Sequence, residues 1–160
     1  MSEAKQLLEY HFWATNKLLQ YINDNCPEVF TREIASVFNS IKETAEHLYI
    51  VDTLWFDRIR GIEADQTNVS FESAKKALKE TKELQQRLID YLKSEDLTRI
   101  GTYKNSIGTI FENTVEEICI HLANHGTYHR GNITAMLWSM GYKSTSTDYI
   151  YFLREKNKLS

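Results

Sequence analysis

The sequence HLANHGTYHRGN, His121–Asn132, carries three of the five histidines in the chain, each four residues from the next. Residues four apart lie one turn apart on the same face of an α-helix. Two imidazoles with this spacing can bind one metal ion from the same side, as in zinc sites of the HExxH type. The stretch therefore predicts a helix that carries part of a metal site.

All three histidines of this stretch cannot share one ion. His121 and His129 are eight residues apart, which is about 12 Å along a helix axis. Ligand nitrogens must lie about 2.0–2.1 Å from the metal. One pair therefore binds, and a third ligand has to come from another part of the chain.

The surrounding residues 114–140 indicate which pair faces inward. On a helical projection His125 and His129 fall within the apolar arc, whereas His121 lies at its edge, so His125 and His129 are the better pair. Asn132 follows three residues after His129 and is placed to orient a ligand or a bound water. The other inward residues are Val115, Ile118, Leu122, Ile133, Met136 and Met140.

Two further histidines lie on amphipathic helical patterns. In residues 3–24, His11 points inward. A buried histidine with a hydrogen-bond partner is the more common arrangement, and a place in the wall of the metal pocket is the alternative. A second helix begins with a predicted capping box at Ser40–Glu43 and ends near Gly61. His47 lies on its apolar arc, as does Arg58, which would snorkel or neutralise an anion. The other arc residues are Thr44, Leu48, Val51, Leu54 and Trp55.

The rest of the chain provides scaffold. A third helix is predicted from Ser70 to about Leu92 and has no histidine, and residues 97–113 suit a hairpin turning at 105–108. A short last helix is predicted from about 148 to 156. Four long amphipathic helices indicate an all-α fold, a four-helix bundle, as one domain over residues 1–160. The metal site is expected at one end of the core, between the second and fourth helices.

Composition excludes several classes of function. With 42% hydrophobic residues, 26% charged residues and a net charge of −3, the chain offers no concentrated basic surface for nucleic acid. Its apolar runs are too short for a membrane-spanning helix, and its first residues lack the apolar block of a signal peptide. Cys26 and Cys119 do not form a disulfide framework. A cytoplasmic protein with reduced thiols and no membrane partner is expected.

Four segments together resemble the DinB family of DinB/YfiT-like bundles. They are YHFWATNKLL at 10–19, the Ser40–Gly61 segment, HLANHGTYHRGNI at 121–133 and DYIYFL at 148–153. The resemblance implies an up-down-down-up bundle with a divalent metal ion, zinc or nickel, on His47, His125 and His129. His11 and Thr15 depart from the family pattern, which usually has asparagines in that opening segment.

The resemblance also implies an activity. Some members of the family are thiol S-transferases or thiol-dependent isomerases that use a low-molecular-weight thiol, and many others are described as hydrolases. Three imidazoles leave a coordination position open to either chemistry. No glutamate follows His125, which counts against peptide hydrolysis of the HExxH type and favours a thiol transferase. The alternatives are a metal-dependent hydrolase, a metal-binding or sensing module without turnover, and a purely structural bundle.

The predicted pocket takes a small-molecule substrate, and its walls are expected to include His11, Arg58, Tyr128 and Asn132. A homodimer is also expected. The outer arc of the 114–140 helix carries the small residues Ala123, Thr127, Gly131 and Thr134, flanked by Ile120 and Trp138. Small residues let two helix backbones approach closely, either within the bundle or across a two-fold dimer axis.

Overall fold

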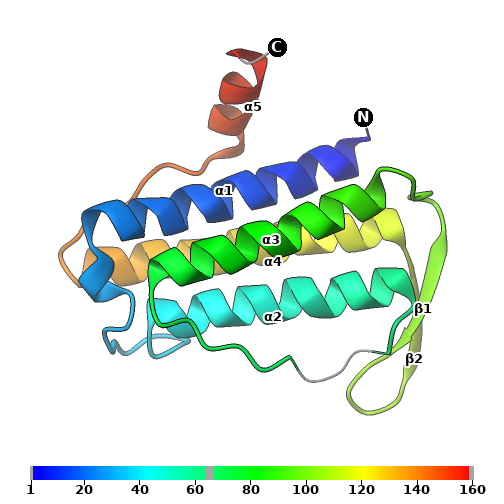
Figure 1. The fold of residues 1–160 in the computed structure, drawn as a ribbon, viewed down its shortest axis with the longest axis horizontal. Helices are drawn as coiled ribbons and strands as arrows, with labels where there is room; N and C mark the ends of the chain where they lie inside the picture. The colour runs from blue at the N-terminus through cyan, green and yellow to red at the C-terminus, as the bar shows by residue number, and fades with distance from the viewer. Residues whose placement is uncertain (1, 64–66, 159–160) are drawn as a thin grey trace.

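Four long helices form the body of the molecule in a computed structural model that describes residues 2–63 and 67–158. They are α1 (Glu3–Asn25), α2 (Ile41–Arg60), α3 (Ala74–Leu92) and α4 (Val115–Ser139). α1 and α4 run in one direction, and α2 and α3 run in the other (Figure 1). This order confirms the predicted up-down-down-up four-helix bundle.

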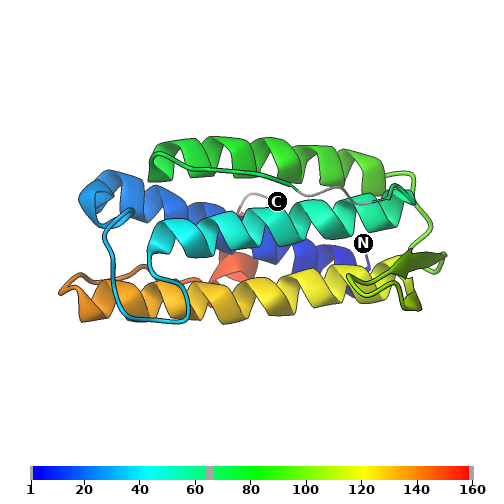
Figure 2. The same ribbon diagram turned by 90° about the horizontal axis from the view of Figure 1, so that it is seen from below.

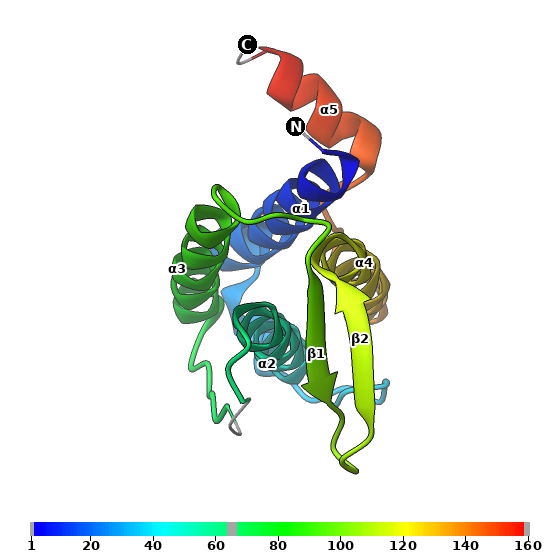
Figure 3. The same ribbon diagram turned by 90° about the vertical axis from the view of Figure 1, so that its right-hand side faces the viewer.

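The packing of the helices places α1 and α2 on a diagonal. Viewed along the bundle, α1 lies between α3 and α4, and α2 faces it across the core (Figure 3). One apolar cluster fills the end that contains Phe30, Phe71 and Met136. A second fills the opposite end and contains Phe12, Phe56 and Leu88. Between them lies a layer of buried polar side chains: His11, Thr15, Asp52, Thr81, Gln85 and Arg130.

Two predicted helix starts need correction. Helix α3 is capped by Ser73, not Ser70, because Phe71 is fully buried ahead of the helix and its backbone N–H donates to Glu46 Oε1 at 2.8 Å. At the start of α2, Ser40 accepts from the Glu43 N–H, but the Glu43 carboxylate accepts from the Asn39 N–H. Ser40 and Glu43 therefore form only half of the predicted capping box. A complete one, with both bonds present, begins α4 at Thr114 and Glu117.

The buried face of α2 is rotated from the predicted arc. Val51, Leu54 and Trp55 are only partly buried. The helix instead buries Asp52, which is 2% exposed, in line with Ile41, Thr44, Ala45, Leu48, Phe56 and Ile59. The predicted arc followed apolar side chains, and it missed this orientation because a buried aspartate needs partners that only the other helices supply.

The remaining elements flank the bundle. Strands β1 (Ile100–Lys104) and β2 (Ile110–Thr114) pair antiparallel around the predicted turn, where Gly108 has φ 83°. A short 3-10 helix, Pro27–Val29, follows α1. Helix α5 (Tyr149–Lys158) docks on the outer side of α1 through Phe152 (Figure 1). In the described ranges no helix has the length and apolar character needed to cross a membrane.

Candidate metal centre

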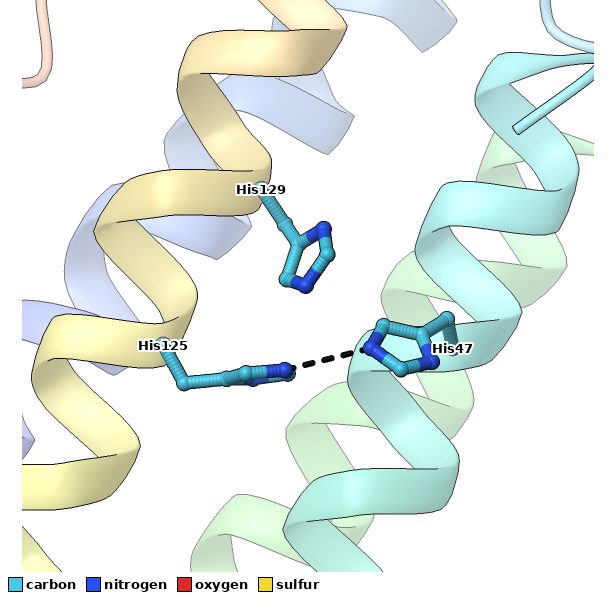
Figure 4. Close-up of side chains that lie close together, drawn as sticks. All are labelled: His47, His125 and His129. Carbon is cyan, nitrogen blue, oxygen red and sulfur yellow. Dashed lines mark hydrogen bonds between the residues drawn. The ribbon is translucent and has the colours of Figure 1, made fainter. Parts of the chain in front are cut away.

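Three histidines from two helices meet in the seam between α2 and α4. The ligand atoms of His47, His125 and His129 all lie within 4.8 Å of one another. The ring centroid of His129 lies 4.5 Å from that of His47 and 4.4 Å from that of His125. The three rings point toward one another across the seam (Figure 4). Helix periodicity aligns the α4 pair, and the antiparallel packing of α2 brings in the third ring.

The seam between α2 and α4 runs lengthwise along the side of the bundle (Figure 2). His47 lies in the second turn of α2, whereas His125 and His129 lie near the middle of α4. The prediction of a site at one end of the core is therefore wrong. Because α2 begins beside the C-terminal half of α4, its second turn meets the middle of its neighbour. The segment 30–40 lies at one end of this seam and the β1–β2 hairpin at the other.

The donor atoms suit a divalent cation. The Nε2 atoms of His47 and His125 are 3.1 Å apart, and nitrogens that share a tetrahedral ion stand about 3.3 Å apart. The Nδ1 atoms of His125 and His129 are buried without a hydrogen-bond partner among the described residues. Buried polar atoms are nearly always paired, so these orphaned nitrogens mark a site that is polar for a reason other than folding.

The electrostatics keep the rings ready to bind. Burial, followed by the charges of His129 and His47, lowers the pKa of His125 to about 4. Burial also lowers the pKa of His47 and of His129. Imidazole ligates only when it is neutral. At neutral pH the three rings can therefore accept a cation without first losing a proton.

Comparison with known proteins identifies the relatives of this chain. A sequence model of the DinB family matches residues 1–158. The chain belongs to the DinB family. It is 35% identical over 160 residues to protein DinB of Bacillus subtilis strain 168. The aligned region covers 94% of this chain and 93% of the relative. A crystal structure of a DinB-like protein from Bacillus cereus ATCC 10987 has the same fold, with a TM-score of 0.70, 21% identity, and coverage of 89% of this chain and 94% of that one.

His121 stands outside the group formed by His47, His125 and His129. Its side chain is exposed, and its ring centroid lies 5.9 Å from that of His125 and 4.8 Å from that of Trp55. The three-residue group that could hold an ion does not include it. His121 thus belongs to the rim of the seam, on the side that leads toward the hairpin.

The other expected pocket residues are dispersed. Tyr128 is 61% exposed, with its ring 5.0 Å from that of His129. The Asn132 Nδ2 atom is buried and has no hydrogen-bond partner among the residues that the structure describes. Arg58 lies farther along α2, against the hairpin. Sequence reasoning missed Phe38, whose ring centroid lies 4.9 Å from that of His47 and 5.6 Å from that of His129. Phe38 is part of an irregular segment and has no periodicity that could have identified it.

His11 belongs to the polar layer of the core. It is fully buried, and its Nε2 lies 3.1 Å from Asp52 Oδ2. The Arg130 guanidinium donates from Nη1 to His11 Nδ1 at 2.8 Å. Because arginine only donates, Nδ1 must be the acceptor, so the ring proton lies on Nε2 and is donated to Asp52. The imidazole thus links a buried cation and a buried anion across α1, α2 and α4.

The two cysteines provide no nucleophile at the site. Both are free and buried. Burial raises the pKa of the Cys119 thiol to about 12 and raises that of Cys26. A thiol reacts as its thiolate, so these side chains are inert at neutral pH. Any thiol chemistry at the histidine cluster would need a thiol from outside the chain.

Proposed function

We propose that this protein is a metal-dependent transferase that uses a low-molecular-weight thiol, with a divalent ion, zinc or nickel, on His47, His125 and His129. The observation that carries the proposal is the convergence of three imidazoles whose pKa values are lowered. Two of them, His125 and His129, also have a buried Nδ1 without a partner among the described residues. Membership of the DinB family supports it. A divalent ion held there favours the thiolate form of an incoming thiol and so supplies a nucleophile at neutral pH.

The residues around the cluster favour transfer over hydrolysis. Hydrolysis of the HExxH type needs a carboxylate to act as general base. Within the described residues, the metal-binding group contains histidines alone. Asp52 acts on the pKa of His47 and His125 through its charge, but it is buried and bound by His11. A metal-bound thiolate needs no separate base, which suits this donor set.

The aromatic residues would position a small substrate. Phe38 packs against His47 and His129 on one side of the cluster, and Trp55 packs against His121 on the other. These rings give the seam apolar walls that exclude water from a bound electrophile. The histidines would hold the reacting end, and the flat walls would hold the body of the molecule.

The test combines metal content with conjugation activity. Protein purified without a histidine tag is analysed for bound metal and then assayed with cysteine or glutathione and monobromobimane. We expect about one equivalent of metal and conjugation faster than the uncatalysed reaction, with both lost in His125→Ala. His121→Ala is the matched control and should keep the metal. Metal without conjugation would favour a sensing module, and a metal-free protein would favour a structural bundle.

A further inference from the structure

Arg58, on α2, has an unusual environment for a half-buried cation. Its guanidinium carbon lies 4.4 Å from the ring centroid of Trp55 and 4.4 Å from that of Tyr103. Its Nη2 donates to the Lys104 carbonyl at 3.3 Å. Burial lowers the pKa of Arg58. Among the described residues, no carboxylate forms an ion pair with it.

The other arginines that are at least half buried have their hydrogen-bonding groups matched. Arg99 forms a forked pair with Glu95, at 2.7 and 3.0 Å. Arg130 bonds to His11 and to Thr15 within the polar layer. Arg58 has five N–H donors and only one carbonyl contact among the described residues. Contact with the adjoining Trp55 and Tyr103 rings, whose centroids are 5.1 Å apart, holds its planar fork in place and leaves donors for an external partner.

That fork faces an open cleft. The cleft has a volume of about 620 Å³ and lies between the end of α2 and the β1–β2 hairpin. Among the described residues that line it, the charged ones are Arg58, Lys104 and Glu63, and their net charge is positive. Leu54, Ile62 and Tyr103 add apolar surface. Thr102, Asn105 and Ser106 also line it, so the cleft offers polar groups beside apolar surface, as small-molecule sites do.

The cleft lies on the same face of α2 as the histidine cluster. His47 and Arg58 are eleven residues apart, so they differ by only about 20° around α2 and by about 16 Å along it. Helical side chains lean toward the N-terminus, and the longer arginine leans farther, so the gap between the two functional groups is on the order of 10 Å. The His121 and Trp55 rings, in contact at 4.8 Å, bridge this gap from the α4 side.

We propose that Arg58, assisted by Lys104, binds an oxyanion, a carboxylate or a phosphate, of the small molecule whose other end reaches His47, His125 and His129. The planar guanidinium suits the two oxygens of such a group, and the adjoining Trp55 and Tyr103 rings hold it in one orientation. The metal-binding end of this inference rests on the proposed function, whereas the anion-binding end rests on the cleft alone. The substrate class is therefore an anion about 10 Å long that carries a thiol or another metal-binding donor.

A purely mechanical role for Arg58 is the competing explanation. Its stacking on Trp55 and Tyr103 also fastens the hairpin to α2, and that role needs no ligand. The two roles differ in what a substitution changes. Substituting a residue that only holds the hairpin to α2 changes the free energy of unfolding alone. Substituting a binding residue also changes the preference for an anionic ligand.

The first experiment needs no metal. The Nε–Hε NMR signals of the arginines are followed in the metal-free protein during titration with sodium acetate and, separately, with inorganic phosphate. We expect the Arg58 signal, assigned by its loss in Arg58→Gln, to shift and saturate with at least one of the two. The exposed Arg87 is the internal control and should not saturate. The anion that binds more tightly identifies the oxyanion, and an Arg58 signal that responds to neither overturns the proposal.

The second experiment measures the long ligand on zinc-loaded protein by calorimetry. Mercaptooctanoate and mercaptooctanol share a thiol and a chain length, but only the first has a carboxylate. We expect the acid to bind about tenfold more tightly. Arg58→Gln should remove that preference, Arg58→Lys should keep part of it, and Arg87→Gln should leave it unchanged. Equal binding of the acid and the alcohol, or a preference that survives in Arg58→Gln, overturns the proposal. A protein that takes up no zinc refutes the metal centre and leaves the first experiment valid.

Discussion

Gly126 leaves the space that the His11 ring occupies. A Cβ atom on Gly126 would lie 2.0 Å from His11 Nδ1 and 2.6 Å from Arg130 Nη1. Non-bonded carbon and nitrogen atoms do not approach this closely, so any side chain at 126 would displace the His11 ring or separate α4 from α1. Gly126 directly follows the predicted ligand His125. The contact therefore fixes the backbone of α4 at the point where it presents two histidines to the seam.

The first prediction concerns this contact. Gly126→Ala should destabilise the protein by about 1–3 kcal/mol, because the new methyl group overpacks the core against His11 and Arg130. The helix propensity of alanine offsets only about 1 kcal/mol of that loss. Urea unfolding gives the measurement. Gly131→Ala is the matched control, since a Cβ there meets nothing within 4 Å, and it should stabilise the protein slightly. Equal effects of the two substitutions would contradict the role of the contact.

The second prediction concerns the buried charges. Asp52→Ala should cost about 3–5 kcal/mol of stability, because it leaves the Arg130 guanidinium buried without its anion. Asp52 and Arg130 are each 2% exposed. Asp24→Ala, at an exposed position, should change stability by no more than about 0.5 kcal/mol. A wild-type midpoint of denaturation in Asp52→Ala would show that the polar layer does not stabilise the fold.

The third prediction separates the ligands from their neighbour. His47→Ala and His129→Ala should each lose the bound divalent ion, whereas His121→Ala should retain about one equivalent. The exposed ring of His121 lies beyond the group that converges. Metal analysis by mass spectrometry after gel filtration provides the stoichiometry. Retention in His129→Ala together with loss in His121→Ala would mean that the other pair of the α4 histidines binds the metal.

The fourth prediction concerns acid. The pKa of His125 is lowered to about 4 in the folded protein, and that of an unfolded histidine is about 6.5. Between these values the unfolded chain binds a proton that the folded chain does not, so stability present above pH 6.5 is lost as the pH falls toward 4. The metal-free Tm should therefore decline through this window, and the stability that bound zinc adds should be lost as the rings take up protons.

His125→Gln provides the control for the acid prediction. It removes the titrating ring, so its Tm should fall less steeply between pH 6.5 and pH 4 than that of the wild type. Carboxylates contribute equally to both proteins in this range, and the comparison cancels them. Parallel pH profiles for the two proteins would show that His125 does not couple folding to protonation.

The fifth prediction is a homodimer through the outer face of α4. The prediction that Ala123 lies on that face is wrong. Ala123 is only 5% exposed, because α4 packs against both α1 and α2 and buries a wide arc. Ile120 and Trp138 remain 37% and 63% exposed, with Gly131 between them along the helix. Light scattering should give about 37 kDa, twice the 18.7 kDa chain, and Gly131→Arg should give a monomer. A wild-type monomer at tens of micromolar would refute the dimer.

Helical periodicity in the sequence was enough to predict the four long helices and the α4 pair of histidines in the candidate metal centre. The four-residue spacing of His125 and His129 aligns their side chains in any α-helix, whatever packs against it. The hairpin turn at 105–108 was similarly predictable, since its glycine adopts a positive φ. The start of α3 could not be predicted from the sequence, because Ser70 and Ser73 are both suitable caps. The burial of Phe71 selects Ser73.

Only the tertiary structure decided what the histidines and their neighbours do. Asp52 is charged and would be expected outside, yet it is buried because His11 and Arg130 reach it from two other helices. The same packing turns His47 toward the α4 pair and brings Phe38 beside it. A buried charge is stable only beside its partners, and a metal site exists only where its donors converge. Both depend on contacts between segments far apart in the sequence, which helical periodicity does not determine.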